Sequence, residues 1–193
     1  GHRHFAELIA ESMCGQACPV HDVPTACDAL HHTFDKLHRN EAVRVIAMPP
    51  YDALITKALK QHFPGAELEV TSWPTEHLNV TQLADWAQRI RGLGPDLVIP
   101  APPLASLNAP QDTFIAQYEW ILNWSFPFAG RAWDILPILP PETSDSTALQ
   151  RQNLLNARAI ALGKDVRFVE SSTDNARDNL SLLSAWLVDA YRA

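Results

Sequence analysis

Pro95-Asp96-Leu97-Val98-Ile99-Pro100 is the stretch that decides the fold. It is a short apolar run between prolines, which is the pattern of a strand buried on both faces of a parallel sheet. Helical periodicity flanks it on both sides, from about Thr81 to Arg91, closed by Gly92-Leu93-Gly94, and again from about Gln111. A buried strand between two amphipathic helices indicates a β–α–β arrangement.

The same alternation continues through the chain from Val43 onward. It predicts an α/β three-layer sandwich with a five-stranded parallel sheet in the flavodoxin-like order 2-1-3-4-5, preceded by a helical N-terminal extension. We expect one domain over 1–193, with a helical lead-in over 1–41 and the α/β core over 42–193. The expected strands are Val43–Met48, Glu67–Val70, Pro95–Pro100, Ala132–Leu139 and Val166–Val169, and the expected helices are about Ala53–His62, Thr81–Arg91, from Gln111 on, Ser146–Leu162 and Asn179–Tyr191.

Composition and charge narrow the class of function. Of 193 residues, 47% are apolar, which is enough for one core of ordinary size. The net charge is −7 without a run of basic residues, so we expect no binding to nucleic acid. No apolar stretch approaches the roughly 18 residues of a membrane span. The expected partner is a small molecule or a protein of unknown identity. The chain starts at Gly1 without methionine, and the sequence leaves open whether it is a piece of a longer protein, which compartment it occupies and what its oligomeric state is.

A ligand site is expected beyond the carboxyl ends of the strands, in the loops that follow them. The loop after the first strand reads Pro49-Pro50-Tyr51-Asp52 and contains no glycine. A phosphate-binding turn needs a glycine-rich backbone that offers its amide donors, whereas proline has no N–H. Nucleotide binding is therefore not expected, and we expect no cofactor.

Three segments between about 42 and 191 resemble parts of one hydrolase superfamily. They are Pro64-Gly65-Ala66-Glu67-Leu68-Glu69-Val70, Gly94-Pro95-Asp96-Leu97-Val98-Ile99, and Phe168-Val169-Glu170 followed by Asp174-Asn175-Ala176-Arg177. These are similar to the segments around the second strand, the third strand and the Asp-x-x-His block of the SGNH, or GDSL-type, esterases. The resemblance implies that family's three-layer fold and, in its active members, ester hydrolysis by a serine nucleophile.

The residues that carry the family's chemistry are missing from the matching positions. Its Gly-Asp-Ser turn is replaced by Met48-Pro49-Pro50-Tyr51-Asp52, and the loop at 72–76 has no glycine to serve the oxyanion. Asn108 matches the family's oxyanion asparagine only after a shift of several residues, and Arg177 stands where the family has its histidine. Arginine stays protonated and cannot take a proton from serine. Because no histidine follows His77, the usual imidazole proton carrier of this fold has no candidate beyond that position.

The first hypothesis is therefore a degenerate SGNH-like domain that serves as a non-catalytic binding or accessory module. The alternative is a divergent ester hydrolase with a non-standard site, whose candidates are Ser72, His77, Ser106, Asn108 and Asp174. Carboxylates in the same crevice would do acid–base work if burial split their pKa values. The residues expected to line that crevice are Tyr51, Asp52, Glu142, Glu170 and Arg177. Two plainer interpretations stand beside these: His77 caps a helix start, and Asp174 forms an i,i+3 ion pair with Arg177.

The lead-in carries soft metal ligands at short spacing, namely Cys14, Cys18, His21 and Cys27, with His31 or His32 nearby. Zinc suits such a set, which gives a third hypothesis, a metal-binding module. Packed thiols with surface imidazoles, or a Cys14–Cys18 or Cys18–Cys27 disulfide, explain the same residues, and the spacing matches no regular zinc module. We therefore assign no metal ligand.

A dense aromatic group lies between 118 and 133. We expect core packing for this group, with an exposed patch for stacking on sugar rings or on a partner protein as the alternative. The members are Tyr118, Trp120, Trp124, Phe126, Phe128 and Trp133.

Overall fold

The computed structural model describes residues 30–128, 132–171 and 176–192. A parallel sheet of four strands lies at its centre, in the order β2-β1-β3-β4. β1 (Val43–Ala47) pairs with β2 (Leu68–Ser72) on one side and with β3 (Leu97–Ile99) on the other, and β3 pairs with β4 (Asp134–Ile135). The alternation of apolar strands and amphipathic helices therefore predicted the fold class and the start of the strand order.

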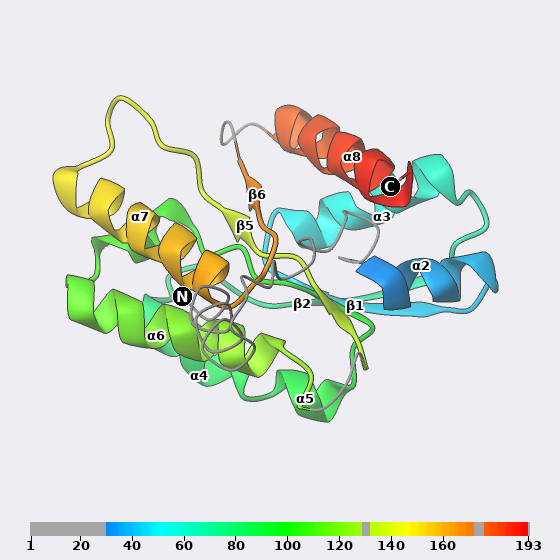
Figure 1. Cartoon of the computed structure of the whole chain (residues 1–193), viewed down its shortest axis with the longest axis horizontal. Helices are drawn as coiled ribbons and strands as arrows, with labels where there is room; N and C mark the ends of the chain where they lie inside the picture. Colours follow the sequence, from blue (N-terminus) through cyan, green and yellow to red (C-terminus); the bar gives the residue numbers. More distant parts are fainter. Residues whose placement is uncertain (1–29, 129–131, 172–175, 193) are drawn as a thin grey trace, which may run out of the picture.

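Helices cover both sides of the sheet (Figure 1). α2 (His31–His38), α3 (Tyr51–His62) and α8 (Ala176–Arg192) lie on one side. The other side carries α4 (Val80–Ala87), α5 (Ile90–Leu93), α6 (Gln111–Ser125) and α7 (Ala148–Gly163). A short 3-10 helix, η2 (Leu104–Asn108), follows β3. Because each helix buries one apolar stripe against the sheet, the core forms two continuous layers. Within the described residues, no helix has the length and apolar character needed to cross a membrane.

The prediction of a five-stranded sheet was wrong, and Pro137 is the reason. The expected strand Ala132–Leu139 is divided at this proline into β4 and β5 (Ile138–Leu139), since proline has no N–H for a ladder. β5 pairs in parallel with β6 (Val169–Glu170), so the last strand joins a separate two-stranded ladder. The N–H groups of Leu136 and Ile138 still donate to the carbonyls of Val98 and Pro100, which keeps β5 beside the end of β3.

The aromatic group is divided between core and surface. Tyr118 is fully buried, and Trp124, Phe126 and Trp133 are partly buried against the core, as expected. Trp120 and Phe128 are exposed, at 45% and 86%. Core packing is therefore the main role of this group, and two of its rings remain on the surface.

Tyr118→Phe is expected to raise the free energy of unfolding by about 1 kcal/mol. The phenol is fully buried and stacks on Phe114, while its hydroxyl has no hydrogen-bond partner among the described residues, and burial raises its pKa. Removing an unpaired buried hydroxyl removes its desolvation cost and keeps the ring contacts. Urea unfolding of the two proteins measures the difference. A loss of stability of the same size would show that the hydroxyl is hydrogen-bonded in solution.

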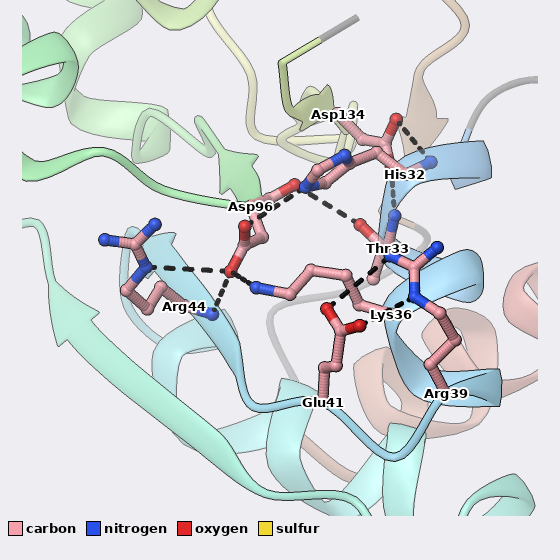
Figure 2. A network of polar contacts seen from close by, with 8 residues as sticks. All are labelled: His32, Thr33, Lys36, Arg39, Glu41, Arg44, Asp96 and Asp134. Atoms are coloured by element: carbon pink, nitrogen blue, oxygen red, sulfur yellow. Dashed lines mark hydrogen bonds and ion pairs between the residues drawn. The ribbon is translucent and has the colours of Figure 1, made fainter.

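A polar network fastens α2 to the amino ends of the strands (Figure 2). The carboxylate of Asp96, just before β3, accepts hydrogen bonds from Lys36 Nζ and from the N–H of Arg44, both at 2.8 Å, and lies 3.1 Å from His32 Nε2. Asp134, the first residue of β4, accepts a hydrogen bond from the N–H of Thr33 at 2.7 Å. Two strands and one helix therefore meet at two nearly buried carboxylates.

The two carboxylates of this network have pKa values shifted in opposite directions. Burial alone would raise the pKa of Asp96, but hydrogen bonds from the Arg44 amide, Lys36 and His32 together hold that pKa below its usual range. Burial raises the pKa of Asp134, and hydrogen bonds from Thr33 and His32 offset this only in part. Because both groups are engaged in fastening the helix and lie at the sheet edge opposite to the carboxyl ends of the strands, we assign them a structural role.

Candidate functional site

A cavity of about 140 Å³ lies at the carboxyl ends of the strands, where the ligand site was expected. Three Pro-Pro pairs converge on it: Pro49-Pro50 after β1, Pro102-Pro103 after β3 and Pro140-Pro141 after β5. We call this cavity the proline crevice. Its other lining residues are Tyr51, Ala101, Leu104, Ile138, Leu139, Ser171 and Asn179.

Parallel pairing brings these loops together although they are distant in the sequence. The N–H of Met48 donates to the carbonyl of Ile99 at 3.1 Å, and that of Ala101 lies 3.2 Å from the Met48 sulfur, so the loops after β1 and β3 start side by side. The N–H of Ser171 donates to the carbonyl of Leu139 at 2.9 Å, which places the loop after β6 beside the third proline pair. The crevice is thus a direct product of the sheet topology.

The proline crevice offers few hydrogen-bond donors. Its six prolines have no N–H, and the backbone amides of Tyr51, Ala101 and Ser171 already donate to Met48 and Leu139. Among the described residues that line it, none is an acid, a lysine, an arginine or a histidine, so this part of the wall carries no charge.

A pair of hydrogen-bonded polar side chains is nevertheless built into the wall. The Ser171 hydroxyl donates to Oδ1 of Asn179 at 2.7 Å, and both side chains are nearly buried. This bond fixes the orientation of the Asn179 amide. Its Nδ2 donates no hydrogen bond to any described residue.

Ser72, His77, Ser106 and Asn108, four of the residues predicted for catalysis, are not among the described residues that line this crevice. Ser72, the last residue of β2, donates to Oδ2 of Asp52 in the first turn of α3 at 2.6 Å. The imidazole of His77 is 91% exposed and lies 3.4 Å from the carboxylate of Glu76. Ser106 is buried and donates to the carbonyl of Pro103 at 2.6 Å, while Asn108 is exposed. The structure therefore joins Ser72 with Asp52, and it gives no hydrogen bond between His77 and a serine among the described residues.

Of the residues predicted to line the crevice, Tyr51 does so. Asp52 and Glu142 are not among the lining residues, nor is Glu170, whose carboxylate pairs with Arg158. The predictions for Asp174 and for the side chain of Arg177 lie outside the described residues, as do those for Cys14, Cys18, His21 and Cys27. In the part of the chain that the structure describes, no group of three or more His, Cys, Asp or Glu side chains is placed to hold a metal ion.

Sequence reasoning missed two lining residues, Ser171 and Asn179. Ser171 directly follows the last strand. Because open α/β sheets bind ligands beyond the carboxyl ends of their strands, the sequence already indicated its loop as part of the site. Asn179 was assigned to the start of the last helix, whose first residue is Ala176 in the structure. Their mutual hydrogen bond has no sequence signature, since serine and asparagine are ordinary residues near a helix start.

Two solved structures are similar to this chain. Both are crystal structures of a two-domain esterase, CEX, active on acetylated mannans, and one was co-crystallised with mannopentaose. They match with a TM-score of 0.60 at 13% and 14% identity, over 84% of this chain and 52% of theirs. The likeness shows an esterase-like fold, and this chain spans about half the length of the structures it matches. No family model and no curated protein matches the chain.

Proposed function

We propose that this chain is a non-catalytic binding domain with an esterase-like fold, and that the proline crevice is its ligand site. The convergence of three Pro-Pro pairs on one cavity carries the proposal. It keeps a concave, largely apolar site at the place where open α/β sheets bind ligands. It also removes the backbone donors that acyl transfer would use there.

The polar groups around the crevice support the same conclusion. Acyl transfer by serine needs a base within hydrogen-bond reach of the hydroxyl, and a histidine is the usual one. Ser171 lines the crevice, and its hydroxyl donates instead to the neutral side-chain amide of Asn179. Ser106 donates to a backbone carbonyl, which cannot take up its proton.

The purified chain is expected to hydrolyse p-nitrophenyl acetate and p-nitrophenyl butyrate no faster than the same protein after heat denaturation. The serines to replace by alanine are Ser72, Ser106 and Ser171, with Ser144→Ala as a matched control, because Ser144 is exposed and bonds only its neighbour Asp145. Turnover that is lost in one of the first three variants and kept in the control would refute a non-catalytic role.

The binding half of the proposal needs its own measurement. In an amide-resolved NMR screen of small neutral molecules, we expect ligands to shift the resonances of Leu104, Ser171 and the Asn179 side chain. A screen in which those resonances never move would contradict the assignment of the crevice as a ligand site.

A divergent ester hydrolase is the second candidate function. The structural likeness to an esterase active on acetylated mannans and the 2.6 Å contact of Ser72 with Asp52 favour it. Acetate released from acetylated mannan by the native chain, and abolished by Ser72→Ala and by Asp52→Asn, would establish this candidate. Retained release in Ser72→Ala would exclude the pair.

A further inference from the structure

We infer that the proline crevice takes a single neutral aromatic ring that bears a hydrogen-bond acceptor, such as an aryl ketone, ester or amide. This inference rests on the proposed binding function and names its ligand class. Three properties of the crevice carry it: its size, the chemistry of its walls and an amide donor among its described lining residues.

The size of the crevice matches one ring. Its volume is about 140 Å³. An engineered apolar cavity of about 150 Å³ holds one benzene molecule. A fused bicyclic system or an extended acyl chain would have to project out of the crevice, whereas one ring with a short substituent fills it.

The walls favour an aromatic face over an aliphatic one. Pyrrolidine C–H groups are electron-poor beside the amide nitrogen, and the face of an aromatic ring carries the negative part of its quadrupole. Proline-rich peptides likewise dock in grooves that are lined by aromatic rings. Six prolines line the crevice, and their fixed φ angles make the walls rigid, so little side-chain entropy is lost on binding.

The polar end of the crevice selects for an acceptor. Ser171 donates to Oδ1 of Asn179, and Nδ2 of the same amide has no hydrogen-bond partner among the described residues. A ligand oxygen is the natural partner of that nitrogen. An anionic or cationic ligand would lose its hydration and meet no charged side chain among the lining residues, so a neutral molecule is favoured.

Acetophenone is the direct probe, because it is neutral, has one ring and accepts but does not donate hydrogen bonds. Titration followed by NMR is expected to shift the Leu104, Ser171 and Asn179 resonances with a Kd on the order of 1 mM, the affinity expected of so small a ligand. Toluene lacks the acceptor and cyclohexyl methyl ketone lacks the aromatic face, so each should bind at least about fivefold more weakly.

Variants separate a specific site from surface binding. Leu104→Trp places a ring in the crevice from a partly exposed position and should weaken acetophenone binding at least about tenfold. Leu162→Trp adds the same ring at a position on α7 that is 65% exposed and should leave binding unchanged. Asn179→Leu should weaken acetophenone and leave toluene unaffected. If Asn179→Leu fails to fold, Leu104→Trp still tests the location of the site, and the comparison of acetophenone, toluene and cyclohexyl methyl ketone still tests the ligand class.

The outcomes distinguish the ligand class from the binding function. Crevice resonances that respond to cyclohexyl methyl ketone or methyl mannoside more strongly than to acetophenone would overturn the aromatic class and leave the binding function standing. Crevice resonances that respond to none of these probes would overturn both. Acetophenone binding that survives Leu104→Trp would place the ligand elsewhere and refute the inference.

Discussion

Asp96→Asn is expected to lower the free energy of unfolding by about 3 kcal/mol at neutral pH. The side chain of Asp96 is 5% exposed and holds Lys36 Nζ at 2.8 Å, and the side chain of Lys36 is itself only 16% exposed. Asparagine can still present an oxygen to the ammonium, but it carries no negative charge and would leave the ammonium charge uncompensated. The same change weakens the hydrogen bond from the Arg44 amide at the start of β1. Urea unfolding at pH 7 measures the loss.

The pH dependence of this loss follows from the lowered pKa of Asp96. A carboxylate whose folded pKa lies below its unfolded value, about 3.9, stabilises the fold above that unfolded value. The stabilisation disappears as the pH falls through the folded pKa. The difference between the native chain and Asp96→Asn should therefore be constant near neutrality and shrink in acid. Asp134, whose pKa is raised, contributes in the opposite direction, but it does so in both proteins.

Two further variants test the cause of the loss. Lys36→Met in the Asp96→Asn background should recover part of the lost stability, because it removes the unpaired ammonium and keeps most of its chain volume. Glu41→Gln is the matched control, since it removes a carboxylate from an ion pair that is exposed. This pair, Arg39–Glu41, is drawn beside the Asp96 network in Figure 2. We expect no measurable change from Glu41→Gln. Equal losses from Asp96→Asn and Glu41→Gln would contradict the argument from burial.

The sequence predicted those features that are encoded locally. Leu97, Val98 and Ile99 are buried on both faces, as an apolar run between prolines indicates, and the amphipathic periodicity of 111–125 corresponds to one helix. The division of the fourth strand was also predictable, because Pro137 removes a ladder donor, and the error lay in extending a strand through it. The sequence did not indicate that Asp96, before β3, accepts a hydrogen bond from Lys36 on α2.

The candidate site was less predictable, because it is made by contacts between loops that are distant in the sequence. Each Pro-Pro pair can be recognised in the sequence, and each follows an expected strand, so all three were expected at the carboxyl edge of the sheet. That the pairs close around one cavity depends on the separate β5–β6 ladder, which the sequence did not indicate. The Ser171–Asn179 bond depends likewise on where α8 begins relative to β6.

Asn153→Leu is expected to lower the free energy of unfolding by about 2–3 kcal/mol. Asn153 is fully buried on α7, and its Nδ2 donates to the carbonyls of Leu107 and Ala109, both at 2.9 Å. Leucine has a similar volume and no donor, so both carbonyls would lose their partner. Urea unfolding measures the loss, and Gln152→Leu, on the exposed side of the same helix turn, is the control that should change stability little.

The effect of Asn153→Leu should be concentrated in the segment that forms one wall of the proline crevice. η2 begins at Leu104, a lining residue, and Asn153 is the side chain that ties its far end to α7. We therefore expect hydrogen exchange of the Ser106 and Ala109 amides to accelerate more than that of the β1 amides. Because a wall that moves no longer presents a fixed surface, ligand binding in the crevice should weaken together with this protection. Uniform acceleration across the chain would instead mean that Asn153 supports global stability and does not specifically hold the crevice in shape.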